Sequence, residues 1–228
     1  MILPANLDAH PVVPFDENQD KIIRFDLTAA NTQLTTAVVE DTRLFVNYVN
    51  ETLSAAGARY GIGGYDEHRT VYSRSTVFDS ADAGEEPRRL HLGTDIWGAE
   101  GTPVFAPLDA AIHSFAFNDQ YGDYGATIIL EHGLPEGKFH TLYGHLSLRD
   151  LEGLQPGKLI AKGTRIGHFG APSENGEWPP HLHFQLILDM GGRSGDYPGV
   201  CRFSERNFWL KNSPDPDLLL HFNRYVRG

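Results

Sequence analysis

The hydrophobic pattern divides the chain into a helical part and a longer part of short strands. Between residues 35 and 56, Phe45, Val49 and Leu53 recur every four positions, and Gly57 follows them. A four-residue apolar repeat that ends at a glycine predicts one amphipathic helix. Residues 1–64 are therefore expected to form an N-terminal extension that contains this helix and packs against the rest of the protein.

Beyond residue 64 the apolar residues come in short runs broken by Gly, Pro, Asp and Asn. Such runs are typical of strands in an antiparallel sheet, and they occur in TPVFAPLDAAIHSFAF, ATIILEHG, FHTLYGHLS, KLIAKGTRIGHFG and PPHLHFQLIL. Residues 65–195 are thus expected to form a mainly β core. Residues 196–228 are expected to form a tail whose LLLHF segment docks on that core.

Composition narrows the classes of function. The 228 residues include 19 Lys and Arg against 30 Asp and Glu, and the formal net charge is -11. Without a basic stripe, the chain is not expected to bind nucleic acid, and without a run of eighteen apolar residues it is not expected to span a membrane. Because Cys201 is the only cysteine, a metal site must be built from His and carboxylates.

The N-terminus bears on localisation. The first thirty residues contain no basic region followed by an apolar stretch and a small-residue cleavage site. As written, the chain is expected to be cytoplasmic, whereas removal of a leader would make it periplasmic or extracellular. The sequence does not predict an oligomeric state.

Two histidines share one face of a predicted strand. In PPHLHFQLIL the two prolines disfavour a helix, and alternation then places His181 and His183 on the same side. Residues two apart on a strand lie roughly 6 to 7 Å apart. One imidazole can therefore bind a metal while the other stands beside the open position of the metal, and the spacing leaves open which is which.

A second pair of possible ligands lies in HLGTD. On a straight strand, His91 and Asp95 would be about 13 Å apart, too far to share one ion. Gly93 between them lets the backbone curl. Two histidines and one carboxylate leave tetrahedral zinc a fourth position, as in catalytic sites.

A further histidine, His145, lies near the end of FHTLYGHLS. If this segment is extended, Tyr143 and His145 share a face, and His145 can stabilise an oxyanion or move a proton. The remaining histidines are interpreted as surface or hydrogen-bonded core residues, with His132 assigned to a turn. They are His10, His68, His113, His132, His140, His168 and His221.

Three separated motifs together resemble the lysostaphin/LytM-type zinc metallopeptidases. They read HLGTDIWGAEGTPVFAPLDA, LYGHLS and PPHLHFQL, in the order of that family, and cover about Leu90 to Leu188. The resemblance implies a small antiparallel β core of the duplicated-hybrid-motif type, with a groove across the metal. Gln185 departs from the family, which commonly has Glu there, and the SENGEWPP loop is longer.

The resemblance also implies the residue roles. His91, Asp95 and His183 would bind Zn²⁺, and His181 and His145 would be catalytic, with His181 as base and His145 at the oxyanion, although the two roles can be exchanged. Trp178 and Tyr143 are candidates for the substrate groove.

The implied activity is that of a zinc metalloendopeptidase. Its substrates would be peptidoglycan cross-bridges, stem peptides or other Gly-rich peptides. GYDEHRTVY, WPPHLHFQ and PDPDLLL are also similar to segments of relatives that resemble modules fused to intracellular enzymes.

Two alternatives remain beside the peptidase. One is a non-catalytic binding or regulatory module on the same scaffold. The other is a carrier domain or phosphocarrier, because Gly-marked hairpins such as LQPGKLIAKGTRIGHFG also occur there. Neither Lys158 nor Lys162 lies at a convincing hairpin tip, and a phosphocarrier has no use for Asp95.

Overall fold

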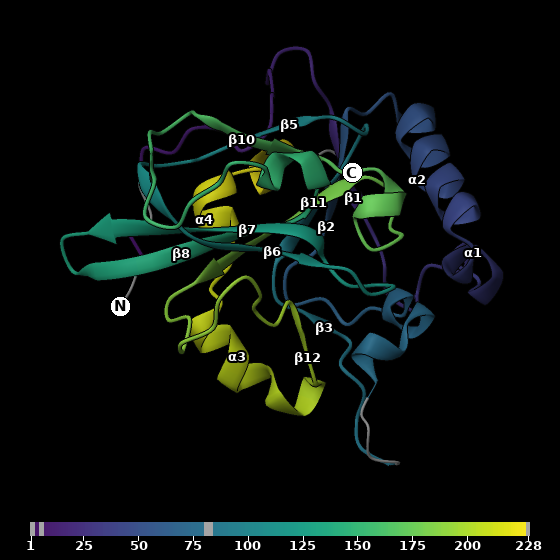
Figure 1. The fold of residues 1–228 in the computed structure, drawn as a ribbon. Helices are drawn as coiled ribbons and strands as arrows, with labels where there is room; N and C mark the ends of the chain where they lie inside the picture. Colours follow the sequence, from purple (N-terminus) through teal and green to yellow (C-terminus); the bar gives the residue numbers. More distant parts are fainter. Residues whose placement is uncertain (1–2, 5–6, 80–83, 227–228) are drawn as a thin grey trace.

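The computed structural model describes residues 3–4, 7–79 and 84–226, and they form mainly strands (Figure 1). The strands are β1 (Ile22–Phe25), β2 (Tyr60–Gly63), β3 (Leu90–His91), β4 (Thr94–Trp97), β5 (Pro103–Phe105), β6 (Ala110–Asn118), β7 (Gly125–Leu134), β8 (Gly137–Leu146), β9 (Leu159–Ile160), β10 (Arg165–His168), β11 (His181–Ile187) and β12 (Val200–Cys201). The α-helices are α1 (Thr36–Glu40), α2 (Thr42–Ala56), α3 (Arg206–Asn212) and α4 (Asp217–Leu220).

Eight of these strands form one sheet in the order β1-β2-β4-β11-β8-β7-β6-β9. The pairing between β1 and β2 is parallel, and the other pairings are antiparallel. Two small sheets, β10-β5 and β12-β3, complete the structure. The mainly β architecture predicted from the sequence is confirmed.

Strand β11 separates the main core from the face that carries the predicted site. Leu182, Phe184 and Leu186 belong to the largest cluster of buried apolar residues. On the opposite face, Ile187 joins a smaller cluster that includes Tyr124 and that is distinct from the main core. The alternation predicted for PPHLHFQLIL is therefore confirmed, and it places His181 and His183 on the face away from the main core.

The helix predicted between residues 35 and 56 is broken into α1 and α2. Asp41 has an extended conformation, and its Oδ1 accepts a hydrogen bond of 2.9 Å from the N–H of Leu44. An aspartate in this position is a favourable helix N-cap, so the chain starts a second helix there. The predicted apolar face is confirmed, since Phe45 and Val49 are buried.

The segments before residue 65 and after residue 195 both contribute to the packed structure. Strands β1 and β2 extend the central sheet beside β4. At the other end of the chain, Leu219, Leu220 and Phe222 lie in the main core. The boundaries placed at these positions from the sequence stay a prediction.

Two expectations for β7 and β8 are wrong. Opposite the single residue Thr127 of β7 lie both Gly144 and His145, and His145 has a φ of 62°. This bulge turns His145 away from the face of Tyr143, which packs in the main core. His132 is not in a turn, because it is fully buried within β7.

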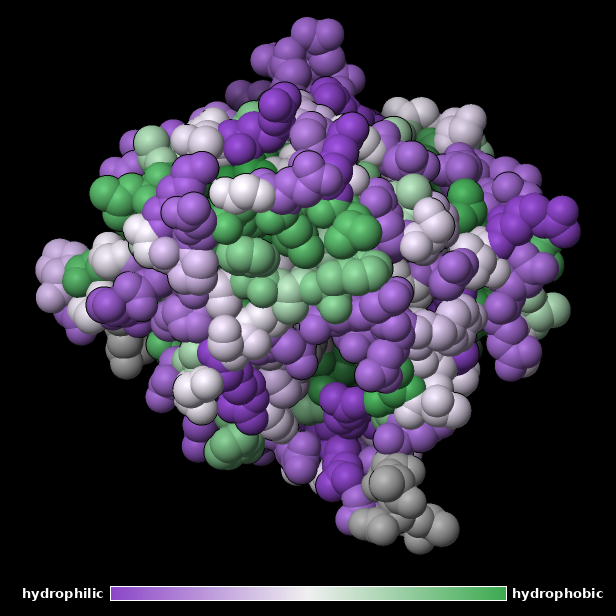
Figure 2. Space-filling view, in the orientation of Figure 1, coloured by the Kyte–Doolittle hydropathy of each residue, from purple (hydrophilic) through white to green (hydrophobic). Residues whose placement is uncertain are grey.

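The outer surface is mostly hydrophilic in the orientation of Figure 2, with one apolar patch just below the place of β10 in Figure 1. Near β10, a shallow hollow is lined partly by Leu159, Ile160 and Ile166. Leu159 is the most exposed of the large apolar side chains in the described residues, at 82%. No helix among those residues is long and apolar enough to cross a membrane.

Candidate metal centre

Three strands bring the predicted metal ligands together. His91 ends β3, Asp95 lies in β4, and His183 lies opposite Asp95 in the register of β11 with β4. His183 Nδ1 is 2.9 Å from His91 Nε2 and 3.1 Å from Asp95 Oδ1, and His91 Nε2 is 3.3 Å from Asp95 Oδ1. Within the described residues, these three form the one group of three or more His, Cys, Asp or Glu able to hold a metal ion.

The chain between β3 and β4 can take this path because residue 93 is glycine. A Cβ atom on Gly93 would lie 2.6 Å from His183 Cε1 and 2.8 Å from the carbonyl oxygen of Phe184. The second contact is with backbone and cannot be relieved by a side-chain rotation. Gly93 is therefore required for the close approach of the two ligand segments.

The outer nitrogen of each ligand histidine is held by a protein acceptor. His91 Nδ1 donates to the carbonyl oxygen of Gly64 at 2.8 Å, and His183 Nε2 donates to Gln185 Oε1 at 3.0 Å. The inner nitrogens then carry lone pairs that face each other and the Asp95 carboxylate. Three acceptors that converge in a buried space fit a cation, and this donor set is suited to zinc.

Burial also keeps these ligands in the state that binds metals. Desolvation lowers the pKa of His91 to about 4, with a further contribution from the Arg69 charge, so its imidazole is neutral near pH 7. Burial alone would raise the pKa of Asp95. The charge of Arg69, whose guanidinium bonds this carboxylate, holds the pKa of the carboxyl well below its usual range.

The sequence analysis missed Arg69. This side chain is almost fully buried, and its Nη1 donates to Asp95 Oδ2 at 2.5 Å and to the hydroxyl oxygen of Tyr72 at 3.1 Å. Its Nε donates to Glu67 Oε2 at 2.7 Å. Arg69 thus holds the second carboxylate oxygen of Asp95 in place. Its position in the polar segment GYDEHR gives no sign that the side chain is buried.

The two predicted catalytic histidines lie beside the ligands and against each other. The rings of His145 and His181 stack with centroids 4.1 Å apart. His145 Nδ1 donates to the carbonyl oxygen of Asn175, and His181 Nδ1 donates to that of Pro179, both at 2.8 Å. Both Nε2 atoms are therefore left without a proton and available as acceptors.

Burial makes both of these imidazoles neutral. Desolvation lowers the pKa of His181 to about 4, and it lowers the pKa of His145 well below the ordinary value, with a further decrease from the neighbouring His181. Trp97 stacks on the other face of His181 at 3.9 Å. The pair therefore consists of two neutral imidazoles held in place by their neighbours.

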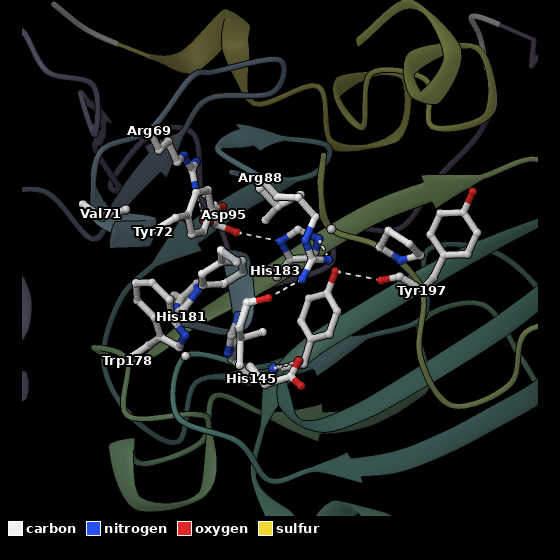
Figure 3. A pocket seen from close by; sticks show the side chains of 18 of the residues that line it. Arg69, Val71, Tyr72, Arg88, Asp95, His145, Trp178, His181, His183 and Tyr197 are labelled. Carbon is white, nitrogen blue, oxygen red and sulfur yellow. Dashed lines mark hydrogen bonds and ion pairs between the residues drawn. The ribbon is translucent and has the colours of Figure 1, made fainter. Parts of the chain in front are cut away.

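A pocket with a volume of about 140 Å³ contains Asp95, His183 and both of these histidines (Figure 3). Trp178, a groove candidate from the sequence, lines this pocket with a buried side chain. Tyr143 faces the main core and does not line the pocket, so the prediction that it lies in the substrate groove is wrong. Sequence reasoning also missed Arg88 and Tyr124 in the lining.

The fold and the site together define a mainly β protein in which two histidines and one aspartate converge as a candidate metal site. Residues 89–194 match the model of peptidase family M23. Over these residues the resemblance to the lysostaphin/LytM type is confirmed.

Several curated proteins are similar to this chain over the same region. The L-Ala--D-Glu endopeptidase of Bacillus subtilis is 30% identical over 129 residues, which cover 54% of this chain and 37% of the relative. An uncharacterized metalloprotease of Haemophilus influenzae is 35% identical over 101 residues, 44% of this chain and 19% of the relative. The chain thus spans a minor part of the length of these relatives.

Among solved structures, the catalytic domain of lysostaphin from Staphylococcus simulans is 20% identical, with a TM-score of 0.41. The match covers 72% of this chain and 96% of that domain. A zinc-containing peptidase from Vibrio cholerae is 28% identical, with a TM-score of 0.35, and the match covers 44% of this chain and 28% of that one.

Proposed function

We propose that this protein hydrolyses peptide bonds with a zinc ion held by His91, Asp95 and His183. The observation that carries the proposal is the convergence of three ligand atoms beside two buried, neutral imidazoles in one pocket. When bound, zinc supplies a Lewis acid that polarises the scissile carbonyl and activates water. The protein supplies the proton transfers.

His181 and His145 divide these transfers. Each presents an unprotonated Nε2, because each Nδ1 donates to a backbone carbonyl. Stacked rings 4.1 Å apart disfavour two positive charges, so one histidine takes up a proton while its neighbour stays neutral. The protonated ring can then stabilise the oxyanion or protonate the departing amine. We assign the base to His181 and the stabilisation of the oxyanion to His145.

The substrates we propose are peptides of the bacterial cell wall, or other Gly-rich peptides. Similar proteins support this class by their names: an L-Ala--D-Glu endopeptidase, a DD-carboxypeptidase/endopeptidase of Neisseria meningitidis and a peptidoglycan DD-endopeptidase of Vibrio cholerae. The matched segments of 101 to 139 residues cover about half of this chain.

The test is a digest of cross-linked peptidoglycan and of oligoglycine by the zinc-loaded protein, followed by mass spectrometry. We expect new peptide termini with the wild type and none with His145→Ala. His113→Ala is the matched control, because this histidine is absent from the pocket lining, and it should cleave like the wild type. If the zinc-loaded wild type cuts neither material, a binding or regulatory module is the better description.

A further inference from the structure

The pocket contains a cation that the metal centre does not use. Arg88 lines the pocket together with Asp95 and His183. One of its terminal nitrogens donates to the carbonyl oxygen of Val77. No carboxylate of the described residues lies within ion-pair distance of the Arg88 guanidinium. Most of the five N–H donors of this side chain are thus left for a ligand.

Other arginines in this region have carboxylate partners. Arg69 lines the same pocket, but its donors are taken by Asp95, Glu67 and Tyr72. Arg89, the next residue in the chain, pairs with Asp79 at 2.7 Å and does not line the pocket. Arg88 therefore differs from its neighbours both in position and in its available donors.

Backbone hydrogen bonds fix where Arg88 lies. Its N–H donates to the carbonyl oxygen of Phe78 at 2.8 Å, and the next N–H, that of Arg89, donates to Cys201 at 3.0 Å. Three residues later the chain reaches the ligand His91. In Figure 3 the Arg88 side chain extends to the side of the pocket where His183 lies. A half-buried guanidinium in this position is suited to bind a carboxylate in two-point geometry.

The pocket also contains negative charge that limits the substrate. Asp123 and Asp196 line it, and neither forms an ion pair with a cation of the described residues. Burial and then the Asp196 charge raise the pKa of Asp123, while Arg88 acts in the opposite direction. Asp123 and Asp196 repel further negative charge. A peptide with several carboxylates therefore binds less well than a peptide with a single carboxylate.

We propose that the site takes short peptides with a free C-terminal carboxylate, which Arg88 binds. Cleavage then releases residues from the C-terminal end of a peptide. This inference rests on the proposed function, because it assigns a substrate class to the same site. Arg88 is a specificity-determining residue in this scheme and takes no part in proton transfer.

The kinetic test compares each peptide that the wild type cuts in two forms, the free acid and the C-terminal amide. We expect kcat/KM to be about 10- to 100-fold higher for the acid, the range of one charge-assisted hydrogen-bond pair. Arg88→Met should lower cleavage of the acid to the level of the amide. Arg88→Lys should recover part of the preference. Arg89→Met is the matched control and should keep the wild-type ratio.

A binding measurement separates the two proposals. Titration calorimetry with metal-free protein uses triglycine and triglycine amide as probes. We expect the wild type to bind triglycine at least tenfold more tightly than the amide, and Arg88→Met to bind both equally. Equal kcat/KM for acid and amide, or equal binding of the two probes by the wild type, overturns the role of Arg88. Failure of the wild type to cut any peptide overturns the proposed function instead.

Discussion

In each of the four buried histidines of the site, the two ring nitrogens have different roles. One nitrogen donates to a fixed protein acceptor, and the other faces the metal position or the pocket. The acceptors are the carbonyl oxygens of Gly64, Asn175 and Pro179 and the side-chain oxygen of Gln185. Because these acceptors fix the tautomers, the chemistry of the site depends on backbone positions as much as on the histidines.

The division between ligands and catalytic residues predicts two different outcomes of alanine substitution. His183→Ala removes an atom 2.9 Å from His91 Nε2 and 3.1 Å from Asp95 Oδ1, so we expect stoichiometric zinc to be lost. His145→Ala should keep zinc and lose turnover. Elemental analysis of both purified variants checks this prediction. Full zinc content in His183→Ala would show that the ligand assignment is wrong.

A second prediction concerns Arg69. Arg69→Met leaves Asp95 and Glu67 without their cation in a buried region, which destabilises a protein by about 3 to 5 kcal/mol. We expect zinc affinity to fall by about 10- to 100-fold, as for other losses of contacts behind a metal ligand. Arg69→Lys should not restore it, since an ammonium cannot bond both carboxylates in this geometry.

Chelator competition measures the affinity, and urea unfolding measures the stability. Arg89→Met serves as the control, because its partner Asp79 is exposed and an ion pair of this kind contributes little. Unchanged zinc affinity in Arg69→Met would mean that Asp95 is positioned without the guanidinium.

At the level of elements, the corner between β3 and β4 brings the ligands together. Gly93→Ala places a methyl group 2.8 Å from the backbone oxygen of Phe184, so β4 and β11 must separate. We expect this variant to lose zinc and to unfold at a lower temperature. Gly133→Ala in β7 is the matched control, since nothing lies within 4 Å of its added Cβ. Zinc content and thermal unfolding of the two variants decide the point, and wild-type zinc content in Gly93→Ala would contradict it.

The sequence predicts an element well where the spacing of its apolar residues is regular. The alternation of β11 and the apolar face of α2 follow from periods of 2 and 3.6 residues, and both are confirmed. The bulge at His145 adds one residue to β8, which shifts every later side chain to the other face. Nothing in LYGHLS marks this extra residue.

The sequence likewise predicts some residues of the site and misses others. Spacing predicts His91, Asp95 and one of the two histidines of β11 as ligands, and only the resemblance to the lysostaphin/LytM type selects His183. Arg69 was missed because its burial depends on segments far apart in the chain, and the pairing of an arginine with two carboxylates leaves no periodic signal.

At the level of the whole molecule, the N-terminal segment packs behind the residues that line the site. Phe45 of α2 packs against Trp97 and Trp178, with ring centroids 6.0 and 6.2 Å apart. Both tryptophans line the pocket. The Thr42 hydroxyl also donates to the carbonyl oxygen of Glu177 in the loop before β11. Helix α2 therefore supports one side of the pocket, although it contributes no ligand.

The core also makes the molecule sensitive to acid through His132. Burial is the main reason why the pKa of this imidazole falls to about 4, against about 6.5 in an unfolded chain. Between these values the unfolded chain binds a proton that the folded protein excludes, so this contribution to stability is lost as the pH falls. The loss is about 2 kcal/mol between pH 7 and pH 5. Urea unfolding of metal-free protein at both pH values should show it.

Other buried histidines, including His91 and His181, titrate in the same direction, so the measurement needs a variant. His132→Gln cannot take up a proton, but it can keep a polar contact with the carbonyl oxygen of Asp109 or with Thr141 Oγ1, the two neighbours of the imidazole. We expect the variant to be less stable than the wild type at pH 7 and the difference to shrink by about 2 kcal/mol at pH 5. A difference that stays constant with pH would mean that His132 has the same pKa in both states, contrary to its full burial in β7.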